Sequence, residues 1–322
     1  MFRVFLPSPG KGVLGALLLI AATPVLRAQS ASEQFLLIGT DTLYGTLTLP
    51  ATDKPAPVVL MIAGSGPTDR DGNNPMMSNN AYRIAADSLQ RHGIASLRYD
   101  KRGIAKSQGA GASEADLRFE HYIDDAAAWI RLLKADKRFS SVTVFGHSEG
   151  SLIGMVAAAK AGADAFISVA GPGESADKVL KRQLAQQAPQ LAETCNPIID
   201  SLKDGHTVNS VNPMLMNLFR PQVQPYLISW FRYDPQTEIA RLTIPVLIIQ
   251  GTTDLQVTTA DAAMLAKAKE QAQLKIISGM NHVLKDAPND LQQNFATYGK
   301  PELPVNAELV TLVTGFIQSL RK

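Results

Sequence analysis

The chain has 322 residues, of which 45% are apolar and 19% are charged, so it can bury a large core and is not expected to be disordered. Its formal net charge of +2 becomes −1 without residues 1–28, which hold three basic and no acidic side chains. No dense Lys/Arg cluster remains, so neither a nucleic acid nor an anionic membrane is indicated as a partner. Small uncharged or weakly charged substrates suit this balance better.

Residues 1–28 have the pattern of a secretory signal peptide. Positive charges at Arg3 and Lys11 precede or flank an apolar run over residues 13–26, and Ala28 offers a small residue for cleavage. The alternative is an uncleaved membrane anchor, but threonine and proline interrupt the run, which is shorter than the ~20 residues that a spanning helix needs. We therefore expect a cleaved signal, a secreted or periplasmic protein, and no stable membrane anchor.

The elements that follow alternate between strand and helix. Residues 34–49 hold two apolar stretches around a Gly-Thr-Asp turn, which indicates an antiparallel hairpin at a sheet edge. Short continuous apolar runs indicate buried parallel strands at residues 58–62, 94–97, 142–145 and 246–249, with weaker candidates at 165–169 and 274–277. Helical periodicity is found at residues 81–90, 119–133 and 152–160. This order predicts an α/β fold with a mainly parallel, doubly wound sheet.

A long segment interrupts the alternation between Gly171 and Ile244, far longer than an ordinary connection between a helix and a strand. It contains helix-compatible stretches at residues 177–187, 197–203 and 214–219. We expect residues 172–241 to form an inserted helical cap over the C-terminal edge of the sheet, where open α/β sheets bind ligands. Residues 29–171 and 242–322 then form the core.

The sequence Gly146-His147-Ser148-Glu149-Gly150 stands between a predicted strand and a predicted helix. Small residues two positions either side of a serine allow a turn tight enough to hold its hydroxyl clear of the sheet, and the helix N-terminus behind it favours negative charge. The alternative is a structural turn. The strand before and the helix after favour Ser148 as a catalytic nucleophile.

A serine hydroxyl is a weak nucleophile at neutral pH and needs a base. Of the five histidines, His282 lies in a loop after the last candidate strand, at the expected C-terminal edge of the sheet; the others are His92, His121, His147 and His206. His147 adjoins the serine on a sharp turn and is expected to point elsewhere. We therefore predict that His282 is the base.

A carboxylate must orient the base, and Asp254 follows the predicted strand at residues 246–249 on the same sheet edge. The alternative for Asp254 is a turn-forming aspartate after a strand. The chain order serine, acid, histidine is the order of α/β-hydrolases rather than of the chymotrypsin or subtilisin types. We therefore predict the triad Ser148, Asp254 and His282.

The tetrahedral oxyanion of acyl transfer needs two backbone donors. The N–H of Glu149, directly after the nucleophile, supplies one. The loop after residues 58–62 contains Gly64-Ser65-Gly66, whose glycines allow close approach of the backbone, so we predict Ser65 N–H as the second donor, with Gly66 as the alternative.

These features together resemble bacterial α/β-hydrolase-fold esterases related to the serine aminopeptidase-like and dienelactone hydrolase-like groups. The resemblance spans residues 34–320. It is carried by Gly64-Ser65-Gly66-Pro67, Asp69-Arg70-Asp71, Arg98-Tyr99-Asp100-Lys101-Arg102-Gly103, the Ser148 turn, Tyr233-Asp234-Pro235 and the segments around Asp254 and His282. It implies a carboxylesterase that acts on short acyl esters without a cofactor.

The charged residues of two of these motifs follow neighbouring strands. Asp69, Arg70 and Asp71 follow the oxyanion loop, and Arg98, Asp100 and Arg102 follow the next strand, so opposite charges are expected to meet and brace that loop. The alternative is separate solvated charges, since exposed ion pairs contribute only ~0–1 kcal/mol.

Ester hydrolysis by way of an acyl-enzyme is the function that these residues favour. A serine aminopeptidase is the first alternative, but the cap segment contains no acidic cluster to hold a substrate ammonium. Acyl transfer and thioester cleavage use the same residues, and a non-catalytic binding protein is least favoured because all three triad residues are present. The histidines are dispersed, so no metal site is predicted, and the sequence does not indicate an oligomeric state.

Overall fold

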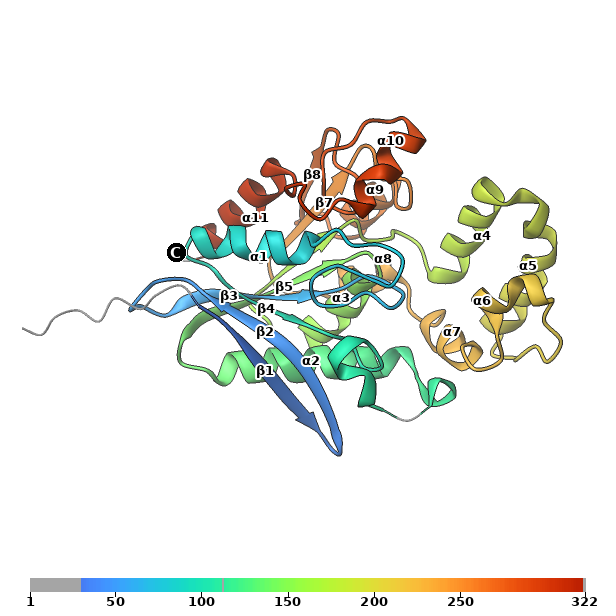
Figure 1. Ribbon diagram of the computed structural model, residues 1–322, viewed down its shortest axis with the longest axis horizontal. Helices are drawn as coiled ribbons and strands as arrows, with labels where there is room; N and C mark the ends of the chain where they lie inside the picture. The colour runs from blue at the N-terminus through green and yellow to red at the C-terminus, as the bar shows by residue number, and fades with distance from the viewer. Residues whose placement is uncertain (1–29, 112, 321–322) are drawn as a thin grey trace, which may run out of the picture.

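The computed structural model describes residues 30–111 and 113–320, so the expected signal segment at 1–28 lies outside the described residues. Its centre is an eight-stranded sheet in the order β1-β2-β4-β3-β5-β6-β7-β8 (Figure 1). Strand β2 pairs antiparallel with β1 and β4, and all other pairs are parallel. The strands are β1 (Ser30–Ile38), β2 (Asp41–Leu49), β3 (Ala56–Ile62), β4 (Ala95–Tyr99), β5 (Phe139–His147), β6 (Ala165–Val169), β7 (Val246–Gly251) and β8 (Gln273–Ile277).

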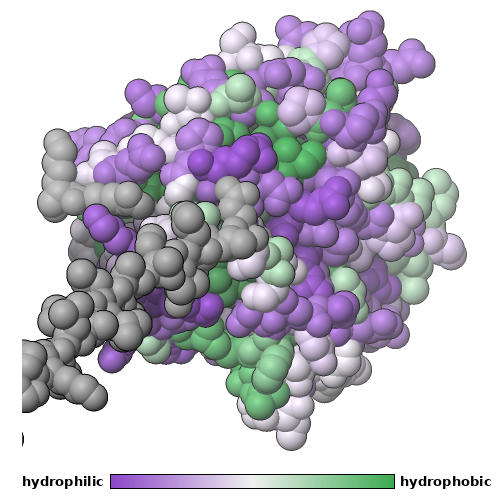
Figure 2. All heavy atoms as spheres, turned by 60° about the vertical axis from the view of Figure 1, so that its left-hand side comes forward, coloured by the Kyte–Doolittle hydropathy of each residue, from purple (hydrophilic) through white to green (hydrophobic). Residues whose placement is uncertain are grey.

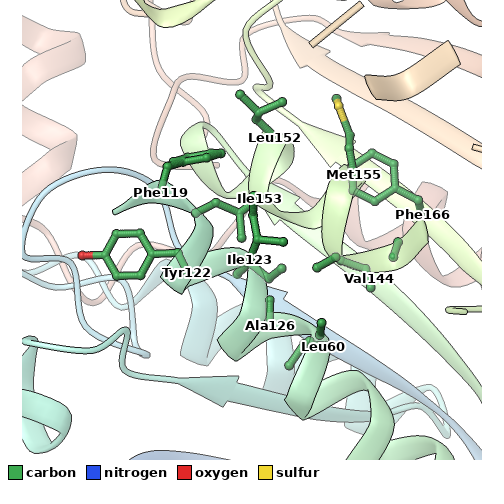
Figure 3. Packing of buried hydrophobic residues seen from close by; sticks show 14 of the residues in the cluster. Leu60, Phe119, Tyr122, Ile123, Ala126, Val144, Leu152, Ile153, Met155 and Phe166 are labelled. Atoms are coloured by element: carbon green, nitrogen blue, oxygen red, sulfur yellow. The ribbon is translucent and has the colours of Figure 1, made fainter. Parts of the chain in front are cut away.

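Helices cover both faces of the sheet because successive strand residues point to opposite faces. On one face, α2 (Phe119–Ala135) and α3 (Glu149–Ala161) pack on side chains such as Leu60, Val144 and Phe166 (Figure 3), and α9 (Thr259–Ala268) packs on β7 and β8. On the other, α1 (Ala81–Arg91) and α11 (Ala307–Ser319) pack on the intervening residues, such as Met61 and Phe145. The predicted mainly parallel α/β architecture is confirmed, including the hairpin at the sheet edge.

The connection from β6 to β7 is the long interrupting segment, and it is helical. Figure 1 shows its first helices beyond the end of the sheet, away from the layers formed by α1, α2 and α11. The helix expected at residues 197–203 begins earlier, at Pro189, and the two short helices after residue 219 were not predicted from periodicity. The helices are α4 (Ala176–Gln187), α5 (Pro189–Lys203), α6 (Met216–Phe219), α7 (Gln224–Trp230) and α8 (Pro235–Ala240).

The remaining elements are short or terminal, and the surface is mixed. A further helix, α10 (Leu291–Ala296), follows the loop after β8. No helix in the described ranges is long and apolar enough to cross a membrane. On the face shown in Figure 2, hydrophilic side chains cover much of the surface and hydrophobic ones form smaller patches between them.

Candidate active site

Ser148 occupies a strained turn between β5 and α3. Its backbone has φ 54° and ψ −124°, which a residue with a side chain rarely adopts, and such strain is retained mainly at functional sites. Two glycines allow the turn. A Cβ on Gly146 would lie 2.3 Å from the Gly150 carbonyl oxygen, and a Cβ on Gly150 would lie 2.3 Å from the Ile62 carbonyl oxygen. Gly146 is therefore required by the tightness of the turn itself, and Gly150 by the contact of α3 with the end of β3.

Asp254 and His282 lie in the loops after β7 and β8, and their side chains are in contact. His282 Nδ1 is 2.8 Å from Asp254 Oδ2. The loops can approach because Gly251 has no side chain: a Cβ there would lie 1.9 Å from the Met280 carbonyl oxygen. The arrangement fixes the ring so that Nδ1 carries a proton toward the carboxylate and Nε2 is left to act as a base.

The Asp254 carboxylate is held in its charged form. Burial by itself raises its pKa, but His282 and the backbone N–H groups of Gln256 and Val257 outweigh burial and keep the pKa of Asp254 below its ordinary value. Both N–H groups donate to Oδ1, at 2.8 and 3.0 Å, and Gln250 Nε2 donates to Oδ2 at 3.1 Å. Asp254 therefore stays negative next to the histidine at neutral pH.

Ser148 and His282 face one cavity, which brings the three predicted triad residues to the same edge of the sheet. Within the described residues no hydrogen bond joins the Ser148 hydroxyl to His282. Catalytic hydrogen bonds of this kind are often long before substrate binds and tighten afterwards. The structure thus places the predicted nucleophile and the predicted base in the wall of one cavity, with the base in contact with the predicted acid.

His147, which was expected only to point away from the serine, contacts Tyr82 and the backbone of His282. Its ring lies between Tyr82 Oη, 2.7 Å from Nδ1, and the His282 carbonyl oxygen, 2.9 Å from Nε2. Burial and the neighbouring His282 lower the pKa of His147 to about 3, so the ring is neutral. A neutral ring that donates a hydrogen bond from Nε2 to this carbonyl accepts a hydrogen bond from the Tyr82 hydroxyl at Nδ1. His147 therefore anchors the backbone of His282.

Tyr82 connects this anchor to the predicted oxyanion loop, a role that the sequence did not indicate. The N–H of Gly64 donates to Tyr82 Oη at 3.2 Å. A Cβ on Gly64 would lie 3.1 Å from the Ser148 Cβ, so the loop lies directly against the nucleophile. Ser65 and Glu149, the two predicted oxyanion residues, both lie beside Ser148 in the wall of a second cavity.

The two cavities share Ser65, Ser148 and Gln256 in their walls but differ in size and chemistry. The larger, of about 280 Å³, lies under the cap and is lined mainly by apolar side chains that include Leu152, Val179, Leu227 and Trp230. The smaller, of about 130 Å³, lies on the His282 side and is lined by polar side chains that include Asn74, Asn79, Tyr82 and Tyr298. The cap segment thus contributes the apolar half of the site.

The predicted brace of the oxyanion loop is present in part. Asp100 accepts from the Arg70 N–H at 2.8 Å and lies 3.2 Å from Arg70 Nε, and Arg98 contacts Asp71 at 2.6 Å. Arg102 does not take part.

The expectation that Arg102 braces this loop is wrong. Its guanidinium binds Asp125 of α2, at 2.6 and 2.7 Å, and Asp41 at 3.0 Å. Asp125 is completely buried, and a buried carboxylate requires a partner, which an exposed loop carboxylate does not. Arg102 therefore connects α2 to the β1–β2 hairpin.

Among the residues that the structure describes, no group of three or more His, Cys, Asp or Glu side chains has the arrangement of a metal site.

The chain is similar in sequence to a family of hydrolases and to an esterase. A family profile described as serine aminopeptidase, S33, matches residues 76–222. Esterase EstD of Thermotoga maritima is 30% identical over 250 residues, which are 75% of this chain and 58% of that protein, so the chain spans little more than half the length of this relative.

Two solved structures illustrate the structural likeness. Est1E from Butyrivibrio proteoclasticus has a TM-score of 0.57 and 17% identity, covering 89% of this chain and 98% of that one. A dienelactone hydrolase from Anabaena variabilis has a TM-score of 0.51 and 18% identity, covering 90% of this chain and 98% of that one. At this level of identity the likeness concerns the fold.

Proposed function

We propose that this chain, which has the α/β-hydrolase fold and is similar in sequence to a serine aminopeptidase family and to an esterase, is a serine carboxylesterase acting on short-chain acyl esters. One observation carries the proposal. The strained Ser148 faces the same cavity as His282, whose Nδ1 is 2.8 Å from the buried carboxylate of Asp254.

The proposed reaction has two halves. Ser148 Oγ attacks the ester carbonyl carbon while His282 Nε2 takes its proton, and the tetrahedral oxyanion is stabilised by the N–H groups of Glu149 and Ser65. His282 then gives the proton to the alcohol oxygen as the C–O bond breaks. Water, activated by the same nitrogen, hydrolyses the acyl-enzyme and restores the Ser148 hydroxyl.

The positions of the two cavities support a proposal for where the two halves of the ester bind. His282 must reach the oxygen of the leaving alcohol, and it lines only the smaller, polar cavity of the pair. The alcohol therefore occupies that cavity. The acyl chain then enters the larger apolar cavity beneath the cap, next to Glu149 and Leu152, where burial of methylene groups favours binding.

The aminopeptidase alternative requires a free carboxylate for the substrate ammonium. Two carboxylates line the acyl cavity, and both already have cationic partners: Glu174 binds Arg182, and Glu149 lies 3.7 Å from Lys101. Neither is free for a second cation, and the apolar lining suits an uncharged acyl group. We therefore favour the ester.

A substrate panel tests the proposal. p-Nitrophenyl esters from acetate to decanoate, the corresponding thioesters, and aminoacyl p-nitroanilides are incubated with the wild type and with Ser148→Ala. We expect ester turnover in the wild type and its loss in Ser148→Ala. Ester turnover that survives in Ser148→Ala would refute the assigned nucleophile, and a preference for the anilides or thioesters would replace carboxylesterase by peptidase or thioesterase.

Export is a separate part of the proposal. The positive and apolar pattern of residues 1–28 supports a secretory signal peptide, and hence a periplasmic or secreted enzyme. Expression of the full chain in a bacterial host, followed by cell fractionation and mass spectrometry of the N-terminus, tests it. We expect a mature N-terminus close to Gln29, and an intact Met1 end in the cytoplasmic fraction would contradict the proposal.

A further inference from the structure

A lysine lies buried beside the proposed oxyanion hole, where the mechanism above gives it no role. Lys101 follows β4 and is 1% exposed. Its Nζ donates to the Gly64 carbonyl oxygen at 2.7 Å, lies 3.7 Å from Glu149 Oε1, and lies 4.8 Å from the centre of the Tyr122 ring. A buried ammonium group is costly unless it is paired and hydrogen-bonded, so these contacts need an explanation.

The contact with Gly64 fixes the peptide group that contains the second proposed oxyanion donor. The Gly64 carbonyl and the Ser65 N–H belong to one peptide unit, and all described peptide bonds are trans. In a trans peptide the C=O and N–H bonds point in opposite directions. A donor that holds the Gly64 oxygen on the interior side therefore aims the Ser65 N–H toward the opposite side, where Ser65 and Ser148 line the cavities.

Among the hydrogen bonds of the described residues, none has the Ser65 N–H as donor. The peptide group on the other side of Gly64 is also held in place, because the Gly64 N–H donates to Tyr82 Oη at 3.2 Å. Both peptide groups of Gly64 are thus fixed, and the second one presents a free donor.

The partner of the ammonium group belongs to the first oxyanion residue. Glu149 supplies the other backbone donor, and its buried carboxylate accepts the Tyr226 hydroxyl of the cap at 2.5 Å. The Lys101 ammonium group therefore contacts both proposed oxyanion residues' surroundings: the carbonyl of the Gly64–Ser65 peptide and the side-chain carboxylate of Glu149. Burial lowers the pKa of Lys101, and the neighbouring Glu149 carboxylate acts against that shift.

We propose that Lys101 is a positioning residue of this hydrolase: by binding the Gly64 carbonyl and pairing with Glu149, it holds the Ser65 N–H in the oxyanion hole. The inference rests on the proposed function. A cation on the Gly64 oxygen also polarises the peptide group, which makes the Ser65 N–H a stronger donor to the developing oxyanion. Without Lys101 the peptide is free to rotate and to present its carbonyl oxygen to the cavity.

Lys101→Met tests the proposal, because it removes the amine and keeps an unbranched apolar stem. We expect kcat for p-nitrophenyl butyrate to fall about ten- to a hundredfold, somewhat less than the loss of an oxyanion donor itself, with KM changed by no more than about twofold. The affinity of an aryl trifluoromethyl ketone, which forms a tetrahedral oxyanion on serine, should weaken in parallel with kcat/KM.

Lys269→Met is the matched control. Lys269 Nζ also donates to a backbone carbonyl, that of Leu242 at 2.6 Å, at the other end of the sheet. We expect this variant to keep the kcat of the wild type. A Lys101→Met variant whose kcat stays within about twofold of the wild type, or whose kcat and ketone affinity do not fall together, overturns the role of Lys101.

A measurement on the wild type covers the case in which Lys101→Met does not fold. In ¹⁵N-labelled enzyme, formation of the trifluoromethyl ketone adduct should move the amide protons of Ser65 and Glu149 to lower field. A low-field shift at Gly66 in place of Ser65 overturns the inference while leaving the esterase proposal intact. A wild type that hydrolyses no ester and forms no adduct at Ser148 refutes both.

Discussion

Replacement of Asp254 by asparagine is expected to remove the base function of His282 while preserving the loop. Asp254 Oδ1 accepts from two backbone N–H groups, of Gln256 and Val257, at 2.8 and 3.0 Å. Oδ2 lies 2.8 Å from His282 Nδ1. An asparagine NH₂ group cannot accept a hydrogen bond, so the amide oxygen must keep the Oδ1 position and the NH₂ group must face the histidine.

The hydrogen bonds around Asp254 also fix the orientation of the new amide. Reversing the amide would leave two backbone N–H groups without an acceptor, at about 1–3 kcal/mol each. Only one contact favours the reversed amide, namely the hydrogen bond that Gln250 Nε2 donates to Oδ2 at 3.1 Å. With the NH₂ group toward Nδ1, the His282 ring carries its proton on Nε2 and cannot take the proton of Ser148. We expect kcat to fall about 10³- to 10⁴-fold, as for a wrong tautomer in a serine hydrolase triad.

The assay is steady-state hydrolysis of p-nitrophenyl butyrate by Asp254→Asn, with Asp164→Asn as the control. Asp164 likewise accepts from a backbone N–H, that of Val142 at 2.7 Å, but at the opposite end of the sheet. The control should keep its kcat. A loss below about tenfold in Asp254→Asn, or an equal loss in both variants, would refute the tautomer argument and point to another acid.

Three further predictions follow from the same structure. In the wild type, kcat/KM should rise about fourfold per acyl CH₂ from acetate until the 280 Å³ cavity is filled, and Val179→Phe should stop that rise at a shorter chain without changing acetate turnover. Gly150→Ala should lower the free energy of unfolding by about 3 kcal/mol and abolish activity, because its Cβ would lie 2.3 Å from the Ile62 carbonyl oxygen. Gly315→Ala in α11, whose Cβ would meet nothing within 4 Å, should raise the free energy of unfolding by about 0.5–1 kcal/mol. Equal melting temperatures of the two variants would contradict this. The pKa of His147 is about 3 in the folded chain and near 6.5 when unfolded, so between these pH values the unfolded state binds more protons than the folded state. The free energy of unfolding should therefore fall by up to about 1.4 kcal/mol per pH unit as the pH drops from 6.5 toward 3. Urea titrations should show this slope in the wild type and not in His147→Asn.

The parts of the candidate site whose position could be predicted from the sequence are those specified by local chain geometry. Ser148 stands between a strand and a helix, and the flanking glycines are required by backbone contacts that any sequence making this turn must accommodate. Asp254 and His282 were located because each follows an apolar run, and the C-terminal ends of parallel strands lie on one edge. The strand ends could therefore be predicted from periodicity, and the proximity of Ser148, Asp254 and His282 followed from the parallel topology.

Residues whose role depends on packing between distant segments were not predicted. Tyr82 belongs to an amphipathic helix, and nothing in its periodicity indicates contact with His147 and Gly64. Arg102 was assigned to the wrong partner because Asp125 follows Asp124 in a helix, and a charged pair of this kind is usually solvated. Only the three-dimensional packing of α2 on the sheet shows that the Asp125 side chain is buried and needs a cation.

Lys101 shows why charge in a motif is an incomplete guide to its environment. It stands between Asp100 and Arg102, in a run that has the composition of a solvated loop, and yet its side chain is enclosed. The reason is the contact between three separate segments: the end of β3 brings a carbonyl, the start of α3 brings a carboxylate, and α7 of the cap brings the Tyr226 hydroxyl to that carboxylate. The same contacts connect Tyr226 of the cap to the Gly64–Ser65 peptide. The connection runs through a hydrogen bond to Glu149, the ion pair of Glu149 with Lys101, and the hydrogen bond of Lys101 to the Gly64 carbonyl. A substrate that moves α7 as it enters the acyl cavity would therefore act on the same buried charges that orient the oxyanion donors.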